Sequence, residues 1–215
     1  MSSAPRIAVV DYGAGNLRSV AKALARSGLV PVVTGDAAEL RRADGVVLPG
    51  VGAFAAAAAS LAERKLGDAV RDSIAAGRPY LGLCLGLQLL FDEGEEHGST
   101  PGLGLLPGRV ARFPACDARG ARLRVPHIGW NEVRFAGAHP MLASLREREL
   151  YYFVHSFCAV PTNADVVVGR VDYGGEFAAA VAHANMFAVQ FHPEKSQAAG
   201  KRLLDAYASW VAQCR

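Results

Sequence analysis

The chain has 215 residues, of which 51% are hydrophobic and 20% carry a charge. Such values are typical of a globular domain with a sizeable buried core, and they exclude a disordered or fibrous protein. The formal net charge is only +3 and the basic residues are scattered, so the sequence indicates no basic patch that would bind nucleic acid. No apolar stretch approaches the roughly 20 residues of a membrane helix, and we expect a cytoplasmic protein.

The first half of the chain alternates short apolar runs with helical patterns. Strands are predicted at Ile7–Val10, Val30–Val33, Val46–Leu48 and Tyr80–Leu83. A helix is predicted from about Leu17 to Ser27, and the alanine-rich segment from Ala53 to Ala76 is predicted to form one long helix. This alternation predicts an α/β fold, with a doubly wound, mainly parallel sheet flanked by helices on both faces.

The second half has a different composition. Between residues 92 and 150, Gly, Pro and Arg are frequent, and short β-like pieces occur at Arg109–Phe113, Arg122–Val125 and Glu132–Phe135. These pieces predict antiparallel additions to the sheet. Longer strand signals return at Tyr151–Val154, Val166–Val171, Phe177–His183 and Phe187–Phe191. A helix from about Gln197 to Ala212 closes the chain, and because no linker is apparent, residues 1–215 are expected to form a single domain.

The four cysteines, at positions 84, 116, 158 and 214, form no C-x-x-C pair. Neither a thiolate zinc site nor a disulfide framework is therefore expected. The Gly13-x-Gly15 turn lacks the third glycine of a dinucleotide fingerprint, because Arg18 stands in its place, and no P-loop is present. We expect no metal and no cofactor, and we interpret the last three cysteines as buried structural residues.

Cys84 differs from the other cysteines because glycines flank it, in the sequence Gly82-Leu83-Cys84-Leu85-Gly86. The segment follows an apolar strand and precedes a helical run to about Phe91, as in the nucleophile elbow of hydrolases. A thiol at the N-terminus of a helix is favoured as a thiolate. The N–H of Leu85 would point toward an oxyanion formed at the same place. Cys84 is therefore a candidate nucleophile.

A base for this thiol is indicated at His192, just after a predicted strand. Functional sites of open α/β sheets collect at that end of the strands. Glu194 lies two residues later, and in extended chain residues i and i+2 share a face, so its carboxylate can orient the imidazole. Cys84, His192 and Glu194 thus form a candidate set of nucleophile, base and orienting group.

Three stretches of the sequence resemble the class I, or triad-type, glutamine amidotransferases. They are Leu48–Phe54 (LPGVGAF), Gly82–Gln88 (GLCLGLQ) and Gln190–Glu194 (QFHPE). The resemblance covers essentially the whole chain. It implies a flavodoxin-like doubly wound fold and the hydrolysis of L-glutamine to glutamate and ammonia through a γ-glutamyl thioester.

The resemblance also assigns further residues of the site. It implies an oxyanion hole made by the backbone of Leu85 and by the loop that holds Val51 and Gly52. Substrate contacts are implied at Gly50, Gln88, Glu96, His155, Ser156 and Phe157. Many relatives have a tyrosine where this chain has Phe157, so a backbone contact is expected there. Glu96 equally fits a solvated acidic loop, and that alternative stays open.

Other segments narrow the resemblance to the glutaminase subunits of imidazole glycerol phosphate synthases. The segments are Val10–Val20 (VDYGAGNLRSV), Pro126–Asn131 (PHIGWN) and His192–Gln197 (HPEKSQ). They imply a heterodimer with a (β/α)8-barrel cyclase subunit, which uses the ammonia to make imidazole glycerol phosphate and aminoimidazole carboxamide ribotide in histidine biosynthesis. The interface is expected to include Asn16, Arg18, His127 and Trp130. Neither nucleic acid nor a membrane is expected as a partner.

Two other functions remain open at the level of sequence. The chain could be a cysteine hydrolase of the same scaffold that serves another pathway, either a different glutaminase or a γ-glutamyl hydrolase. It could also be a non-catalytic interaction module that kept the fold. For two interface candidates a structural role fits equally well, since Asn16 could cap a helix and His127 could be a packed polar residue.

Overall fold

The computed structural model describes residues 4–96 and 98–215. Within them one sheet contains thirteen strands, β1 Arg6–Val10, β2 Val30–Thr34, β3 Gly45–Gly50, β4 Tyr80–Cys84, β5 Phe91–Gly94, β6 Thr100–Pro101, β7 Leu106–Arg112, β8 His127–Phe135, β9 Arg148–His155, β10 Phe157–Pro161, β11 Val167–Asp172, β12 Glu176–His183 and β13 Met186–Val189. The α-helices are α1 Leu17–Ala25, α2 Ala37–Arg42, α3 Phe54–Glu63, α4 Leu66–Ala75, α5 Leu85–Gln88 and α6 Gln197–Gln213. Short 3-10 helices occupy η1 Pro140–Ser144, η2 Ala164–Val166 and η3 Pro193–Lys195.

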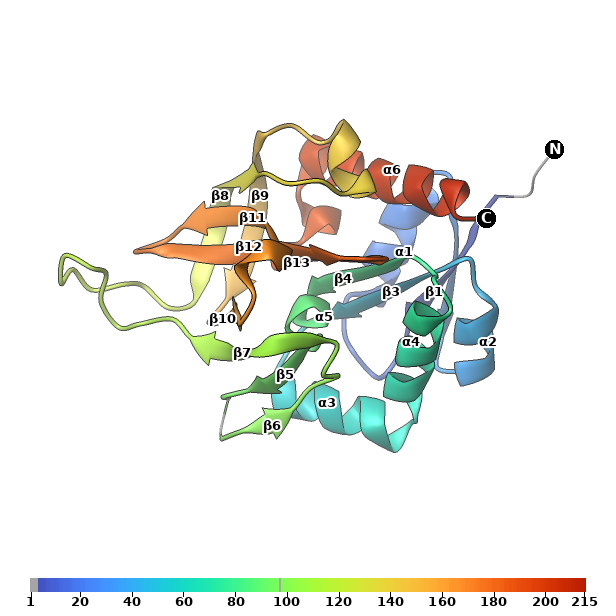
Figure 1. Ribbon diagram of the computed structural model, residues 1–215, viewed down its shortest axis with the longest axis horizontal. Coiled ribbons are helices and arrows are strands. Elements are labelled where there is room, and N and C mark those ends of the chain that lie inside the picture. Colours follow the sequence, from blue (N-terminus) through green and yellow to red (C-terminus); the bar gives the residue numbers. More distant parts are fainter. Residues whose placement is uncertain (1–3, 97) are drawn as a thin grey trace.

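The parallel part of the sheet has the strand order β2-β1-β3-β4-β13. Helices α1 and α6 cover one face of this part, and α2, α3 and α4 cover the other (Figure 1). β1 shows why its sequence is a continuous apolar run. Ile7 and Val9 pack into the core on the α1 and α6 side, whereas Ala8 and Val10 pack into the core on the opposite side. The predicted doubly wound α/β class is confirmed.

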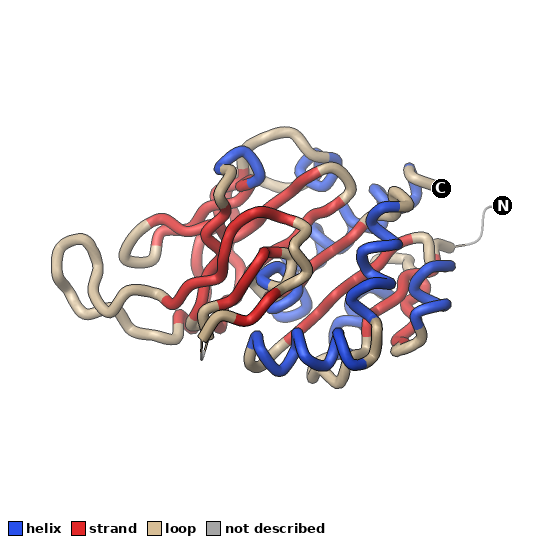
Figure 2. Tube along the Cα trace, turned by 60° about the horizontal axis from the view of Figure 1, so that its bottom comes forward, coloured by secondary structure: helices blue, strands red, loops and turns tan. Residues whose placement is uncertain are grey.

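The rest of the sheet is mainly antiparallel. From β13 the order continues β12-β10-β7-β5-β6, with β5 parallel to β7, while β11 pairs with both β12 and β8, and β8 pairs with β9. These strands form the end of the molecule away from the two termini (Figure 2). The ribbon of β8 and β9 has a buried face with His127 and Val133 and an exposed face with Ile128 and Trp130.

The structure differs from the sequence predictions at several elements. The alanine-rich segment forms two helices, because Lys65 between them adopts a left-handed φ of 55° that ends the first helix. The break allows Leu61 and Leu66 both to be buried. Arg122–Val125 is not a strand, since Arg122 makes only an isolated bridge to Cys116 in an exposed loop. Helix α2 was not predicted from the sequence.

The cysteines other than Cys84 were expected to be buried, and this is wrong for two of them. Cys116 and Cys214 are exposed, while Cys158 is partly buried, and all are free thiols. Cys116 lies in the loop after β7, and Cys214 follows the last buried residue of α6, Val211. Among the described residues, none of the helices combines the length and apolar character needed to cross a bilayer.

Candidate active site

The backbone at Cys84 is strained. The residue ends β4 and precedes α5, with φ 52° and ψ −103°, a conformation that L-residues rarely adopt. The turn directs the chain from strand to helix within a single residue and leaves that residue 7% exposed. Such a turn is typical of a nucleophile elbow.

The two glycines around Cys84 are needed for space rather than for flexibility. A Cβ at Gly86 would lie 1.8 Å from the carbonyl oxygen of Leu48, and one at Gly82 would lie 2.6 Å from the carbonyl oxygen of Gly86. Both separations are far below van der Waals contact. Gly86 packs closely against β3 and Gly82 against the backbone of Gly86 itself, so glycine is required at both positions.

The helix after Cys84 is shorter than the sequence predicted. α5 is a single turn, Leu85–Gln88, and the chain enters β5 at Phe91, which pairs with Leu106 of β7. A helix of this length has a small macrodipole, so the local backbone N–H groups, such as that of Leu85, are its main electrostatic contribution to the thiol.

His192 and Glu194 form a buried hydrogen-bonded pair. His192 follows β13, and Glu194 lies in η3, the 3-10 turn that Pro193 begins. The imidazole Nδ1 lies 2.8 Å from the Glu194 Oε1, and the exposed fractions of the two side chains are 3% and 1%. A carboxylate accepts this bond, so Nδ1 carries the proton and Nε2 is the nitrogen available to the thiol.

The pKa of His192 reflects these neighbours. Burial alone would lower the pKa, but interactions with Cys84 and Glu194 outweigh it and raise the value from 6.5 to about 10. Nε2 is buried and makes no hydrogen bond of standard geometry to any described residue, although the sulfur of Cys84 lies close enough to influence the ring. Catalytic hydrogen bonds are often long before substrate binds. The imidazole is thus a proton donor beside the nucleophile at neutral pH.

Gln190 is a site residue to which the sequence assigned no role. Its Nε2 donates to the sulfur of Cys84 at 3.6 Å, and its Oε1 accepts from Gln88 Nε2 at 3.0 Å. The side chain is completely buried. Gln190 lies two residues before His192, so the i, i+2 spacing that linked His192 to Glu194 was a signal for it as well.

Asn16 reaches the same site from the other end of the chain. Its Nδ2 donates to Glu194 Oε1 at 2.6 Å, to the oxygen that also accepts from His192. The sequence predicted an interface role for Asn16 or a helix cap. It does occupy the N-cap position of α1, but its side chain makes no capping bond. The two partners are 178 residues apart, and nothing local in the sequence indicates the contact.

A pocket of about 310 Å³ opens over Cys84 and His192. Its lining includes most of the predicted substrate and oxyanion residues, namely Val51, Gly52, Leu85, Gln88, Glu96, His155, Ser156 and Phe157. Gly50 lies beneath the pocket, buried at the end of β3 and paired with Cys84 in the sheet. The loop of residues 51 and 52 therefore leaves the sheet directly beside the nucleophile.

The pocket's polar groups are held by the surrounding structure. One oxygen of Glu96 accepts from the backbone N–H of Phe54 at 2.7 Å, which fixes the carboxylate at the start of α3. Gln88 Nε2 also donates to the carbonyl oxygen of Phe157 at 3.0 Å. Both side chains are thus oriented without a ligand.

The four residues predicted for an interface have different surroundings. Arg18 is exposed, and Trp130 is 47% exposed on the outer face of β8, where it packs edge-on against Tyr152. Val51 of the pocket rim is 40% exposed. Asn16 points toward Glu194, and His127 is only 3% exposed because it packs inside against His155.

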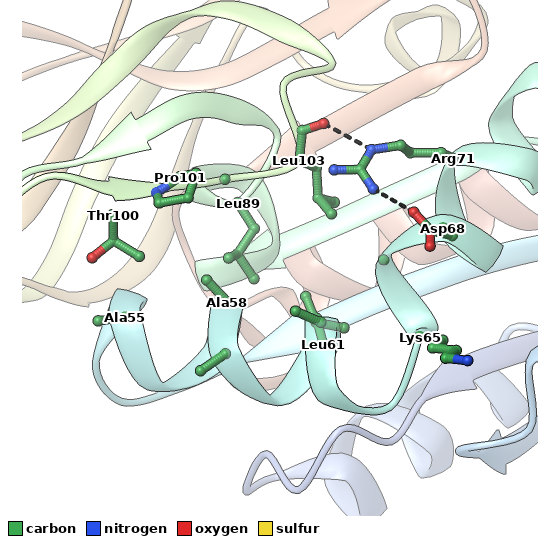
Figure 3. A pocket seen from close by; sticks show the side chains of 14 residues that line it. Ala55, Ala58, Leu61, Lys65, Asp68, Arg71, Leu89, Thr100, Pro101 and Leu103 are labelled. Carbon is green, nitrogen blue, oxygen red and sulfur yellow. Dashed lines mark hydrogen bonds and ion pairs between the residues drawn. The ribbon is translucent and has the colours of Figure 1, made fainter.

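A larger hollow, of about 470 Å³, lies between α3, α4 and β6 (Figure 3). Its walls are mostly apolar, with Ala58 and Leu61 on one side and Leu103 on the other. Arg71 closes one end, where it donates to the carbonyl oxygen of Leu103 and pairs with Asp68. None of the triad candidates lines this hollow, so the smaller pocket is the candidate active site.

The chain is similar to known proteins over nearly its full length. A family model for class-I glutamine amidotransferases matches residues 8–207. Imidazole glycerol phosphate synthase subunit HisH of Geobacillus thermodenitrificans is 49% identical over 205 residues, which cover 95% of this chain and 96% of that protein. The subunit HisH of Methylococcus capsulatus is 50% identical over 209 residues, which cover 95% of this chain and 96% of that protein.

Solved structures agree at the level of the fold. The PurLQS structure from Thermotoga maritima superposes with a TM-score of 0.76 at 22% identity, over 96% of this chain and 99% of that chain. The glutaminase domain of CTPS from Trypanosoma brucei, with bound acivicin, has a TM-score of 0.64 at 17% identity, with 97% and 94% covered. The resemblance indicated by the sequence is confirmed, and the chain belongs to the class-I glutamine amidotransferases, among the HisH subunits of imidazole glycerol phosphate synthase.

Proposed function

We propose that this chain hydrolyses L-glutamine in histidine biosynthesis and supplies the ammonia to the cyclase subunit of imidazole glycerol phosphate synthase. The observation that carries the proposal is the arrangement of three buried side chains, in which a strained Cys84 shares a pocket with His192, and Glu194 orients the imidazole. The relatives that are about half identical to this chain over almost its whole length support the pathway.

The proposed reaction begins with attack of the Cys84 thiolate on the amide carbon of the glutamine side chain. The C–N bond then breaks while His192 gives its proton to the leaving nitrogen, so that ammonia departs and a γ-glutamyl thioester remains. Water attacks the thioester with His192 as the base, and glutamate and the thiol are released. The raised pKa of His192 keeps the donor protonated at neutral pH.

Substrate binding is assigned to the groups that line the pocket. Gln88 and the backbone of residues 155–157 would hold the amino-acid end of glutamine, and the carboxylate of Glu96 suits its α-ammonium group. Phe157 has no hydroxyl, so its contribution is limited to the backbone and ring. The chemistry requires no metal or cofactor.

The oxyanion of the tetrahedral intermediate would be held by the N–H of Leu85 and by an N–H from Val51 or Gly52. Removing one such donor typically lowers the rate by about 10²–10³-fold. A loop that turns one N–H toward or away from the site is therefore a capable switch. We propose that partner docking turns the Val51 peptide inward, and that the isolated chain hydrolyses glutamine much more slowly than the complex.

The cyclase subunit is proposed to be a (β/α)8 barrel that forms a heterodimer with this chain. Exposed apolar side chains near the pocket support a docking surface, with Ile128 and Trp130 on the outer face of β8 and Val51 on the pocket rim. Tryptophan is the residue type most enriched in the energetic centres of interfaces. Asn16, which precedes α1 and is hydrogen-bonded to Glu194, and Arg18 in the first turn of α1 complete the proposed contact region.

We further propose that the chain is a single glutaminase domain of the cytoplasm that binds neither nucleic acid nor membranes. The test of the proposed function is glutamate release by the purified chain, with and without a cyclase subunit and its ribotide. We expect release that depends on Cys84 and rises strongly with the cyclase, and Cys84→Ala is the control. Equal rates for the wild type and the Cys84→Ala variant would refute the proposal.

A further inference from the structure

The side chains of two buried histidines at the active-site pocket have no part in the reaction proposed above. His127 and His155 stand directly opposite each other in the antiparallel pair of β8 and β9, and His127 Nδ1 lies 3.0 Å from His155 Nε2. Aromatic rings surround the two imidazoles, namely Phe113, Phe153, Tyr173 and Phe177. His127 is 3% exposed and His155 is 6% exposed, so each ring nitrogen depends mainly on a protein partner.

The hydrogen bonds of His155 fix the position of its proton. Its Nδ1 lies 2.9 Å from the carbonyl oxygen of Phe157, and because a carbonyl only accepts, Nδ1 must carry the proton. Burial lowers the pKa of His155 to about 3, so the ring is neutral. Its Nε2 is then an acceptor, and the Nδ1 of His127 must donate to it.

His127 is neutral as well and carries its proton on Nδ1. Burial lowers the pKa of His127 to about 4, so its Nε2 has no proton and accepts. Asn131 Nδ2 lies 3.4 Å from this nitrogen. The orientation of the Asn131 amide is set independently, since Nδ2 also donates to the carbonyl oxygen of Asp172 and Oδ1 accepts from the N–H of Glu132. Every donor therefore points the same way, from Asn131 through His127 and His155 to Phe157.

The chain of hydrogen bonds continues to the nucleophile. The carbonyl oxygen of Phe157 accepts a second bond, from Nε2 of Gln88, whose other N–H donates to Gln190 Oε1. Fixing Oε1 in this way turns the Nε2 of Gln190 toward the sulfur of Cys84. The relay of Asn131, His127 and His155 thus ends on the carbonyl that holds Gln88, and Gln88 in turn holds Gln190.

We propose that His127 and His155 are positioning residues of the glutaminase, whose one-way hydrogen bonds hold the Phe157 carbonyl and so fix Gln88, which in turn keeps Gln190 aimed at Cys84. The inference deepens the proposed function and depends on it for the identity of the reaction. His155 is no second base for the thiol, because both of its ring nitrogens are already hydrogen-bonded.

Two substitutions of His127 separate positioning from packing. His127→Phe keeps a ring in the aromatic cage but leaves Nε2 of His155 without a donor. His127→Asn places an amide N–H near the former Nδ1 and so keeps the donor, but it loses the ring and its packing. We expect His127→Asn to lower the melting temperature more, and His127→Phe to lower the rate more.

The rates are measured as glutamate release in the complex with the cyclase subunit. For His127→Phe we expect kcat/KM to fall about tenfold or more, the scale of one lost buried hydrogen bond, with the larger part in kcat. Alkylation of Cys84 by iodoacetamide in the isolated chain should slow as well. It is followed on the Cys84 peptide by mass spectrometry, because Cys116 and Cys214 are exposed thiols that react with iodoacetamide too. If the variant with the lower melting temperature also had the lower rate, the proposal would be overturned.

The proton positions can be observed directly. In ¹⁵N-histidine-labelled chain, NMR should show both rings neutral and protonated on Nδ1 at pH 6. An Nε2–H form or a cationic ring at either residue would overturn the relay. These spectra and the alkylation rates do not depend on glutamine turnover. If the wild-type complex released no glutamate, the proposed function would fail, while the relay would still be decided by the NMR result.

Discussion

Replacing Glu194 by glutamine removes the negative charge beside His192 while keeping the shape of the side chain. In the wild type, Oε1 accepts from both His192 and Asn16. Because both partners are donors, the oxygen of the new glutamine side chain must take the place of Oε1. The imidazole therefore keeps its orientation and its tautomer. The amide nitrogen then takes the place of Oε2, which has no hydrogen-bond partner among the described residues.

The expected loss follows from the change of a charged hydrogen bond to a neutral one. Hydrogen bonds to charged groups contribute about 1.5–3 kcal/mol and neutral ones about 0.5–1.5 kcal/mol, so the difference is about 1 to 1.5 kcal/mol. That difference corresponds to about a tenfold lower kcat/KM. Glu194→Leu is the control, because it leaves Nδ1 of His192 without an acceptor, and its loss should approach the roughly 10⁴-fold known when an imidazole is held in the wrong tautomer.

The pH profile gives a second readout of the same substitution. The carboxylate helps to raise the pKa of His192 from 6.5 to about 10, so without it the imidazole loses its proton at a lower pH. The alkaline limb of kcat/KM, measured as glutamate release in the complex, should move toward neutrality. The protonated imidazole also stabilises the folded state. Because its pKa is higher in the folded chain than in the unfolded one, this contribution is fully present below pH 6.5 and is lost as the pH rises toward about 10. An unchanged rate and an unchanged alkaline limb in Glu194→Gln would refute the role assigned to the carboxylate.

Three further substitutions test other contacts. Asn16→Ala removes one donor from Glu194, and we expect kcat to fall about tenfold with little change in KM, measured as glutamate release in the complex. Gly86→Ala forces a methyl group against the carbonyl of Leu48, and we expect at least about 1–3 kcal/mol of destabilisation in thermal melts, with loss of Cys84 reactivity. Trp130→Ala should weaken binding of the cyclase by about 2 kcal/mol or more in calorimetry, while Cys84 still reacts normally in the isolated chain.

Each of these outcomes has a clear opposite. Unchanged turnover in Asn16→Ala would show that the contact of Asn16 with Glu194 does not contribute to catalysis. A Gly86→Ala variant as stable as the wild type would show that the elbow does not pack as tightly as the geometry implies. Cyclase affinity that is unaffected in Trp130→Ala would exclude the outer face of β8 from the interface.

Much of the parallel sheet could be predicted from sequence, because its strands are buried on both faces and therefore appear as uninterrupted apolar runs. The run at Ile7–Val10 is the clearest case. The helix break at Lys65 could not be predicted, since alanine-rich sequence on both sides favours helix and the break is set by packing on the sheet. The sequence predicted some of the antiparallel strands but not how they pair, because the pairing depends on partners far away in the chain.

The candidate site shows the same division. Cys84, His192 and Glu194 were indicated by short local patterns, an elbow and an i, i+2 pair. The structure places Cys84 and His192 at one pocket, with Glu194 hydrogen-bonded to the imidazole. The contact of Asn16 with Glu194 and the pairing of His127 opposite His155 depend on which segments become neighbours in the fold. Local sequence carries no signal for either, so only the structure could assign them.

The central claim is that Cys84 carries the γ-glutamyl group during turnover. The most direct test is to quench the reaction of the complex with acid during glutamine turnover and to measure the masses of its proteolytic peptides by mass spectrometry. We predict one γ-glutamyl adduct on the Cys84 peptide of the wild type and none in Cys84→Ala, which should also release no glutamate. Glutamate release by the Cys84→Ala variant, or an adduct on another residue, would contradict the account.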